Sequence, residues 1–239
     1  MTSLLDAYEI RARLIPALLT VAALPIIVVA LGFREEPLVT ALLALFAAIG
    51  GPLLLAYLAR EQGGKLQEKL FSQWGGPPTT ALLRVGDGGE RDLKRLQRRS
   101  AVEKAWGSCL PSRQDEINDP VAADQVYESA VSWLREHTRD KEAFPLVFSE
   151  NSNYGFHRNL LALKPWGIAF TGAGCFALIS VIVANLWLLS LAWFDLLGGL
   201  AACGAALALW LTFPTQRRVR TAGETYAARL LDASLNITP

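Results

Sequence analysis

Residues 14–33 read LIPALLTVAALPIIVVALGF, and residues 37–59 read PLVTALLALFAAIGGPLLLAYLA, and neither stretch holds an Asp, Glu, Lys, Arg or His. Two further apolar runs extend from Trp166 to about Trp187 and from about Leu196 to Phe213. The hydrocarbon core of a bilayer takes about 20 helical residues to cross, so each run is long enough. The sequence therefore predicts an all-α membrane protein with four transmembrane helices in two hairpins.

Two further points concern these runs: whether the first is a signal peptide, and where the turn between the third and fourth lies. The first run is longer than the apolar region of a signal peptide, and no small-x-small cleavage site follows it, so we expect a retained helix. Between the third and fourth runs, Asn185, Ser190 and Asp195 mark the expected turn, because the polar backbone of a turn needs water.

Basic residues are distributed on one side of the predicted helices. Of the 23 Lys and Arg residues, 22 lie in residues 1–13, 60–164 and 214–239, and the other is Arg34 in the first hairpin tip. By the positive-inside rule, both termini and the central insert are expected in the cytoplasm, and the chain is expected to be a multi-pass membrane protein.

The overall composition excludes some classes of protein. Hydrophobic residues make up 52% of the 239 residues and charged residues 19%, below the roughly 25% of a soluble domain. The net charge of +1 gives no bulk attraction for a polyanion. Within the runs there is no charged group of the kind that a transporter needs at membrane depth, so ion conduction would need several protomers or a hydrophobic gate. Small residues at Gly198, Ala202 and Ala206 favour close helix packing, within one chain or between subunits.

We divide the chain into four parts: an N-terminal transmembrane hairpin (1–59), a mainly helical cytosolic domain (60–164), a C-terminal transmembrane hairpin (165–213) and a cytosolic amphipathic tail (214–239). In the cytosolic domain, residues 91–109 and 120–139 are expected to be helices, the second with Asp119 as its N-cap. Residues 144–148 are expected to be extended and residues 151–159 to form a loop. In the tail, Thr221 and Glu224 have the spacing of a capping box that opens a short helix.

The strongest candidate for a binding surface is a cationic stripe. Arg91, Lys94, Arg95, Arg98 and Arg99 have the spacing i, i+3, i+4, i+7 and i+8, which places them on one face of a helix. Such like charges repel, so the stripe needs an anionic neighbour. Three alternatives remain open: ion pairs within the chain, ligand phosphates and lipid headgroups.

A second candidate is the turn at residues 75–80, GGPPTT, which precedes a helix carrying Arg84. Thr79 or Thr80 is expected to cap that helix, whose free N–H groups suit a phosphate. The alternative is an ordinary capped turn, since the spacing is not that of a Walker motif.

The third candidate is the segment 151–159, NSNYGFHRN, which combines amides, aromatic rings and a cation. Asn151, Tyr154 and Arg158 are residue types that contact bases and phosphates in single-stranded nucleic acids. Such residues also form ordinary loops and anchors at a membrane interface.

Residues for catalysis are sparse. The sequence has two histidines, His137 and His157, and nothing places either beside Cys109. We therefore expect no enzymatic activity, no metal and no cofactor.

Two motifs resemble those of a known family. They are Trp74-Gly75-Gly76-x-Pro78-Thr79-Thr80-x-Leu82-Leu83-Arg84, and Glu150-Asn151-x-x-Tyr154-Gly155-Phe156-x-Arg158-Asn159-Leu160 with Leu163-Lys164-Pro165. They resemble those of a bacterial family of four-helix membrane proteins, which is similar to the membrane effectors of anti-phage defence operons paired with a nucleotidyltransferase, of the Hailong or CBASS type. The resemblance covers nearly the whole chain in layout, but specific residues only in these motifs.

The resemblance implies a homo-oligomeric effector in the bacterial inner membrane that acts in abortive infection. A nucleotide or single-stranded oligonucleotide made by the partner enzyme would bind the cytosolic domain and set whether an ion channel opens or the membrane is disrupted. The alternative is a non-catalytic membrane scaffold that binds a cytosolic protein partner.

Overall fold

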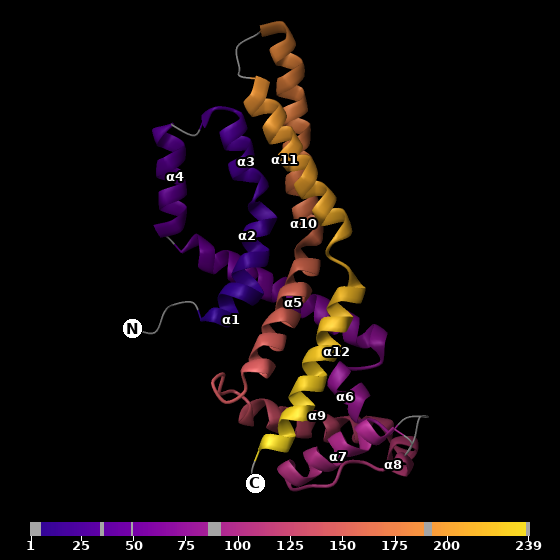
Figure 1. The fold of residues 1–239 in the computed structure, drawn as a ribbon. Helices are drawn as coiled ribbons and strands as arrows, with labels where there is room; N and C mark the ends of the chain where they lie inside the picture. Colours follow the sequence, from indigo (N-terminus) through magenta and orange to yellow (C-terminus); the bar gives the residue numbers. More distant parts are fainter. Residues whose placement is uncertain (1–5, 34–35, 49, 86–91, 189–192, 238–239) are drawn as a thin grey trace. The chain divides into compact units, whose positions relative to one another are not determined.

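The computed structural model describes residues 6–33, 36–48, 50–85, 92–188 and 193–237. Every regular element within these ranges is a helix (Figure 1), so the predicted all-α class is confirmed for them. The chain divides into two compact units. We call Met1–Leu66 with Gly155–Arg218 the apolar unit, and Gln67–Tyr154 with Val219–Pro239 the polar unit.

Within the described residues, three helices are long and apolar enough to cross a membrane: Ala7–Ala30, Pro145–Trp187 and Trp193–Thr212. The first of them is built from α1 (Ala7–Glu9), the π-helix η1 (Ile10–Leu14), α2 (Ile15–Val21) and α3 (Ala23–Ala30). The break between α2 and α3 lies at Ala22, close to Pro25, whose ring nitrogen cannot donate to the carbonyl of Val21.

The predicted second span, residues 37–59, is divided between two helices. Helix α4 (Pro37–Ala48) and helix α5 (Gly51–Trp74) differ in direction by 57°. Gly50, between them, has a φ of +84°, which glycine adopts without the strain of a Cβ. Pro52 lies in the first turn of α5, where its missing N–H costs nothing. The pair is long and apolar enough only when both helices are taken together, which would make a fourth span.

Helix α10 (Pro145–Leu188) contradicts two predictions. The extended segment at residues 144–148 is wrong because the helix begins at Pro145, in a first turn that tolerates proline. The loop at residues 151–159 is also wrong, because these residues lie inside the same helix. Their polar side chains have partners: Ser152 Oγ donates to the carbonyl of Phe148 at 2.9 Å, for example.

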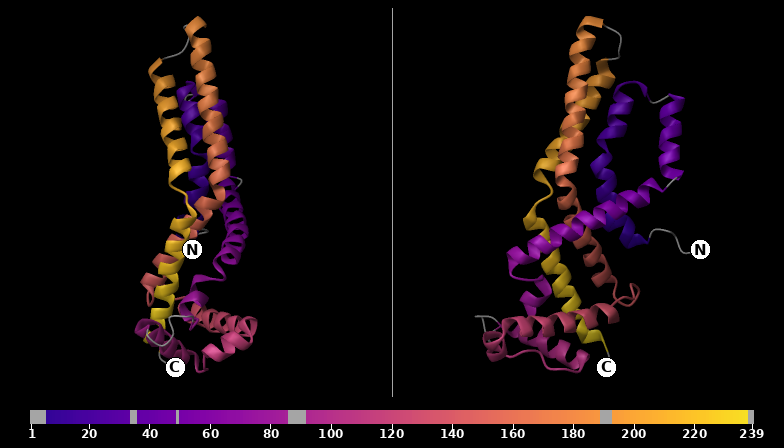
Figure 2. Two further views of the ribbon diagram at one scale, coloured as in Figure 1. Left: turned by 90° about the vertical axis from the view of Figure 1, so that its right-hand side faces the viewer. Right: turned by 180° about the vertical axis from the view of Figure 1, so that it is seen from behind.

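Helix α11 (Trp193–Thr212) runs beside the second half of α10 (Figure 2) and packs against α3 through small residues. A Cβ added at Gly199 would collide with Ala30, and Cys203 is fully buried. A Cβ added at Gly198 would meet nothing within 4 Å. The small residues at Gly199 and Cys203 therefore pack within one chain, whereas Gly198 faces open space among the described residues.

The turn between the third and fourth predicted spans is only partly described. Asn185 lies inside α10 and Asp195 inside α11, so neither of them is in the turn as predicted. Ser190 lies outside the described residues.

The polar unit is a small helical domain. Its helices include α6 (Pro78–Leu83), α7 (Leu93–Trp106), α8 (Arg113–Asn118), α9 (Pro120–His137) and the 3-10 helix η4 (Ala233–Asn236). Its core is formed by buried residues that include Leu83, Val102, Tyr127, Leu134 and Leu230. The predicted N-cap of α9 is confirmed, because the Asp119 carboxylate accepts from the backbone N–H of Ala122 at 2.9 Å.

Helix α12 (Gln216–Asp232) supplies a further part of that core. The predicted capping box at Thr221 is wrong, because Thr221 lies inside this helix rather than at its start. Helices α5, α10 and α12 each begin in one unit and end in the other. The predicted domain boundaries after residues 59 and 164 accordingly fall inside α5 and α10.

Candidate functional site

The predicted cationic stripe lies along α7. Arg91 is outside the described residues, and Lys94 is exposed. Arg95 donates to the carbonyl of Val85 at 2.8 Å and lies 3.8 Å from the carboxylate of Asp92. These contacts bring Arg95 against the chain that leaves α6, rather than leaving it free on an open cationic face.

The last two arginines of the stripe have partners within the polar unit. Arg98 Nε donates to Asp232 Oδ1 at 2.7 Å, and its side chain is only 11% exposed. Asp232 is the last residue of α12, so this ion pair joins α7 to the C-terminal segment. Of the three alternatives for the stripe, ion pairs within the chain account for Arg98.

Arg99 is buried and its guanidinium is surrounded by acceptors. It donates to the hydroxyl of Tyr127 at 2.9 Å, to the carbonyl of Pro111 at 2.6 Å, and to the carbonyl of Leu83. A buried charge is tolerated when its donors are satisfied in this way. Arg99 thus joins α6, α7 and α9 at the centre of the polar unit, and its predicted contact with a ligand phosphate stays a prediction.

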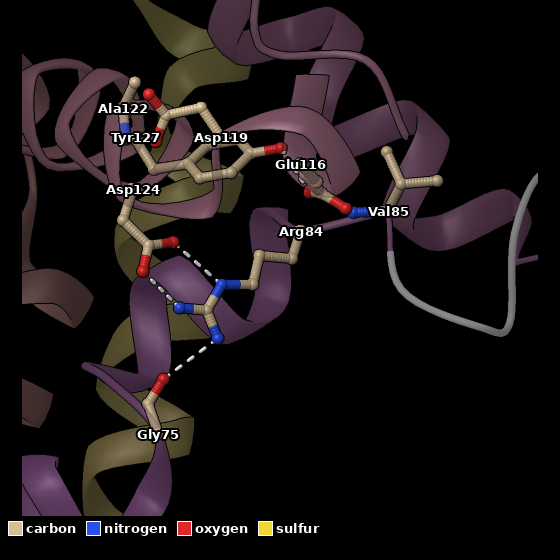
Figure 3. A network of polar contacts seen from close by, with 8 residues as sticks. All are labelled: Gly75, Arg84, Val85, Glu116, Asp119, Ala122, Asp124 and Tyr127. Carbon is tan, nitrogen blue, oxygen red and sulfur yellow. Dashed lines mark hydrogen bonds and ion pairs between the residues drawn. The ribbon is translucent and has the colours of Figure 1, made fainter. Parts of the chain in front are cut away.

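Arg84 faces the carboxylate of Asp124, as Figure 3 shows. Its Nε donates to Asp124 Oδ1 at 2.8 Å, a second nitrogen pairs with Oδ2, and Nη1 donates to the carbonyl of Gly75 at 2.9 Å. The hydrogen bond to Asp124 raises the pKa of the Arg84 guanidinium above its usual value. Gly75 has a φ of +74°, which aims its carbonyl here and favours glycine at this position.

Tyr127, which accepts from Arg99, extends that network to Glu116 and to Val85, the residue after Arg84 (Glu116, Tyr127 and Val85 are drawn in Figure 3). Its hydroxyl donates to Glu116 Oε1 at 2.6 Å, and the same oxygen accepts from the backbone N–H of Val85 at 2.8 Å. Burial, reinforced by the hydrogen bond to Glu116, raises the pKa of Tyr127 to about 12. The phenol therefore stays protonated and works as a fixed donor at physiological pH.

Beside this network lies a groove of about 370 Å³, lined by Arg84, Arg113, Glu116, Ile117 and Asp124 among others. Two acids in the wall balance its two arginines. The groove therefore has no net positive charge with which to attract a polyphosphate.

Thr79 and Thr80 do not cap α6 as predicted. The N-cap position is occupied by Pro77, which has no side chain that can accept a hydrogen bond. Both threonines are inside the helix and buried, 3% and 1% exposed. The hydroxyl of Thr80 has no hydrogen-bond partner among the described residues.

The three predicted residues of the 151–159 segment lie on α10, and Asn151 is half-buried there. Tyr154 is buried, donates to Gln67 Oε1 at 3.2 Å and stacks on Tyr226 with ring centroids 6.3 Å apart. Arg158 Nε donates to Asn159 Oδ1 at 3.2 Å. Tyr154 therefore supports the packing of the polar unit rather than offering a free ring.

Asn159 belongs to the second sequence motif but was not among the predicted binding residues. It is fully buried in the apolar unit, where its Nδ2 donates to the carbonyl of Ala12 in η1 at 2.6 Å. A Cβ added at Gly63 would collide with the Asn159 side chain, so glycine is required at that point of α5. One amide thus joins three helices of the apolar unit.

No pattern in the sequence could have identified the acidic partners of the arginines. Asp124 lies 40 residues from Arg84, and Asp232 lies 134 residues from Arg98. Tyr127, in contrast, occurs on the apolar face of α9, where its spacing from Ala130 and Leu134 gave a usable signal.

The described residues contain no group of three or more His, Cys, Asp or Glu side chains that could hold a metal ion.

A scan against protein-family models and searches of curated proteins and of solved structures return no match.

Proposed function

We propose that this chain is a membrane effector of bacterial anti-phage defence. In this proposal it forms a homo-oligomer in the inner membrane and crosses it four times in two hairpins, with α4 and the start of α5 as the second span. Both termini and the polar unit are cytoplasmic. A nucleotide or oligonucleotide from a partner nucleotidyltransferase binds the polar unit and controls the permeability of the membrane. The chain itself catalyses no reaction.

The observation that carries this proposal is the continuity of α10. Its residues up to Tyr154 belong to the polar unit and those from Gly155 onward to the apolar unit, within one helix of 44 residues. A continuous helix passes a displacement along its length more directly than a loop does, although Pro165 removes one backbone hydrogen bond between the two ends of α10. A ligand that shifts the first turns of α10 therefore acts directly on a candidate membrane span.

The surface of the apolar unit supports the membrane part of the proposal. Phe176, Trp187 and Phe194 are 74%, 85% and 93% exposed, which in water would be a large unfavourable apolar surface. Lipid is the solvent that suits such side chains. Because the predicted spans carry so few polar groups, a water-filled path needs several copies of the chain, which is why the proposal includes an oligomer.

Co-expression in a bacterial host tests this proposal. Cells carrying the full chain, with and without the partner nucleotidyltransferase, are followed with a voltage-sensitive dye and by growth. We expect the membrane potential to differ between the two conditions, and the nucleotidyltransferase alone to have no effect. An unchanged potential and unchanged growth in every combination would contradict the effector function. A C-terminal fluorescent-protein fusion that stays dark would contradict the cytoplasmic tail.

A scaffold is the second candidate, and exposed apolar side chains on the polar unit favour it. Leu93, Ile117 and Val121 are 73%, 65% and 67% exposed, so their apolar side chains are available for contact with a protein partner. A scaffold predicts that a cytosolic protein co-purifies with the chain while the dye signal does not change. The co-expression experiment therefore separates the two candidates.

A further inference from the structure

A cavity of about 600 Å³ that is open to solvent lies at the surface of the polar unit, next to the end of α5, the start of α6 and the exposed face of α9. This volume is in the range of small-molecule sites, about 300–1,000 Å³. Gln67 and Phe71 line it from α5, and Thr79 and Thr80 from α6. The cavity is separate from the groove beside Arg84, with which it shares no lining residue.

One hydroxyl in the wall of this cavity lacks a partner. Thr80 is 1% exposed, and its Oγ1 makes no hydrogen bond with any described residue. Other buried threonines are satisfied: Thr138 donates to the carbonyl of Leu134 at 2.8 Å, and Thr171 to that of Gly167 at 2.6 Å. Buried polar groups are almost always paired, so the unpaired hydroxyl at Thr80 is a candidate for a bond to a ligand, made when the side chain rotates about χ1 and turns the oxygen, which is itself buried, toward the cavity.

Helix α9 presents a polar face to the same cavity. The residues that line it recur at i, i+3, i+4, i+7 and i+10, a helical spacing: Gln125, Glu128, Ser129, Ser132 and Arg135. This face adjoins the apolar one that packs into the core. The cavity is therefore lined with hydroxyls and amides, and α9 contributes one acid and one base whose charges cancel.

This chemistry distinguishes between classes of ligand. A polyphosphate or an extended nucleic-acid backbone needs an excess of positive charge, which this cavity lacks. Amides and hydroxyls pair with the edges of a base and with ribose hydroxyls, and the ring of Phe71 offers an aromatic surface for a base. Arg135 supplies one cation, enough for a single phosphate.

We propose that this cavity binds one nucleoside unit carrying at most one phosphate, and that Thr80 Oγ1 hydrogen-bonds to it. The inference rests on the proposed function in identifying this ligand with the signal that controls the membrane helices. Binding itself is measured without any membrane activity, so the proposed binding site and the proposed effector function can be contradicted separately.

Isothermal titration of the purified full chain in detergent tests the site. The probes are the four ribonucleosides, their 5′-monophosphates and free ribose, at concentrations up to about 1 mM. We expect at least one nucleoside or monophosphate to bind. Thr80→Val keeps the shape of the side chain, and we expect it to weaken the binding of that compound about tenfold through the lost hydrogen bond. Arg135→Gln is expected to weaken the binding of the monophosphate but not the binding of its nucleoside.

Thr138→Val is the matched control, since it removes a buried hydroxyl from the same unit but not from the cavity. No binding of any nucleoside or monophosphate overturns the proposal, as does binding that Thr80→Val leaves unchanged. Ribose binding as tightly as the nucleosides also overturns it, because the base then contributes nothing. Nucleoside binding without any change in membrane potential retains the site and rejects the effector function.

Discussion

Replacing Arg99 with lysine tests whether this member of the cationic stripe stabilises the polar unit. Arg99 is 9% exposed and donates to three acceptors, the carbonyls of Leu83 and Pro111 and the hydroxyl of Tyr127. A lysine keeps the charge, and its one nitrogen can replace Nη1, which donates to Leu83 and Tyr127, but not also Nη2, which donates to Pro111, so we take one of the three bonds as lost. At about 1.5–3 kcal/mol for a hydrogen bond to a charged group, the free energy of unfolding falls by about 1.5–3 kcal/mol.

Thermal unfolding of the full chain in detergent measures this loss. Tryptophan fluorescence is a suitable probe because Trp106 and Trp133 pack against the core of the polar unit. For a domain of about 100 residues each kcal/mol lowers the midpoint by roughly 4–8 °C, so Arg99→Lys should lower it by about 6 °C or more. Lys94→Ala, at an exposed position on the same helix, should leave it nearly unchanged. If Arg99→Lys unfolds at the same midpoint temperature as the wild type, the structural role argued for Arg99 is refuted.

Four further measurements follow from the structure. A double-mutant cycle of Arg98→Ala and Asp232→Ala, followed by unfolding, should give a coupling of about 1 kcal/mol or more, because Arg98 is mostly buried; zero coupling would contradict the ion pair. The pKa of Tyr127 is raised to about 12 from the usual 10.0, so its contribution to stability is complete below pH 10 and is lost as the pH rises through about 12; unfolding curves of Tyr127→Phe should lack this loss. Asp119→Ala should lower the free energy of unfolding by about 1 kcal/mol through the lost N-cap of α9, and Asp119→Asn should lower it much less. Leu134→Ala, at a fully buried position, should cost about 2–5 kcal/mol, and a smaller loss would mean that the core is looser than described.

Helix positions were predictable where a local pattern determines them. Long apolar runs and the Asp119-Pro120 pair required no knowledge of the rest of the chain, because helix length and N-capping are local effects. Residues 151–159 were predicted as a loop because their amides and hydroxyls suggested exposure. The partner of Asn159 is the carbonyl of Ala12, 147 residues away, and no local pattern shows that such a polar side chain is satisfied inside a helix bundle.

The candidate site was predictable only as a set of residue types. The spacing of the stripe correctly placed Lys94, Arg95, Arg98 and Arg99 on one helix. It did not show that the helix turns part of that face toward the core, since the acceptors around Arg99 come from α6, α9 and the chain before α8. Charge spacing determines which side chains are neighbours, but tertiary packing determines whether they meet solvent or protein.

The structure also changes what the two sequence motifs can mean. In the first motif, Gly75 positions a carbonyl for Arg84, and Arg84 pairs with Asp124. In the second, a Cβ at Gly155 would approach Ala12 too closely, and Asn159 bonds to the carbonyl of that same residue. Each of these contacts is a packing requirement of the fold.

A resemblance carried by such residues therefore indicates a shared architecture more strongly than a shared signal, because one architecture can hold different sites. Residues that distinguish one ligand from another should lie where packing leaves a choice. The polar face of α9 is such a place, since Gln125, Ser129 and Ser132 line a cavity without forming the core. Exchanging side chains on this face should change which nucleoside binds and leave the fold intact, whereas exchanges at Gly155 or Asn159 should destabilise the fold before they alter any preference for a ligand.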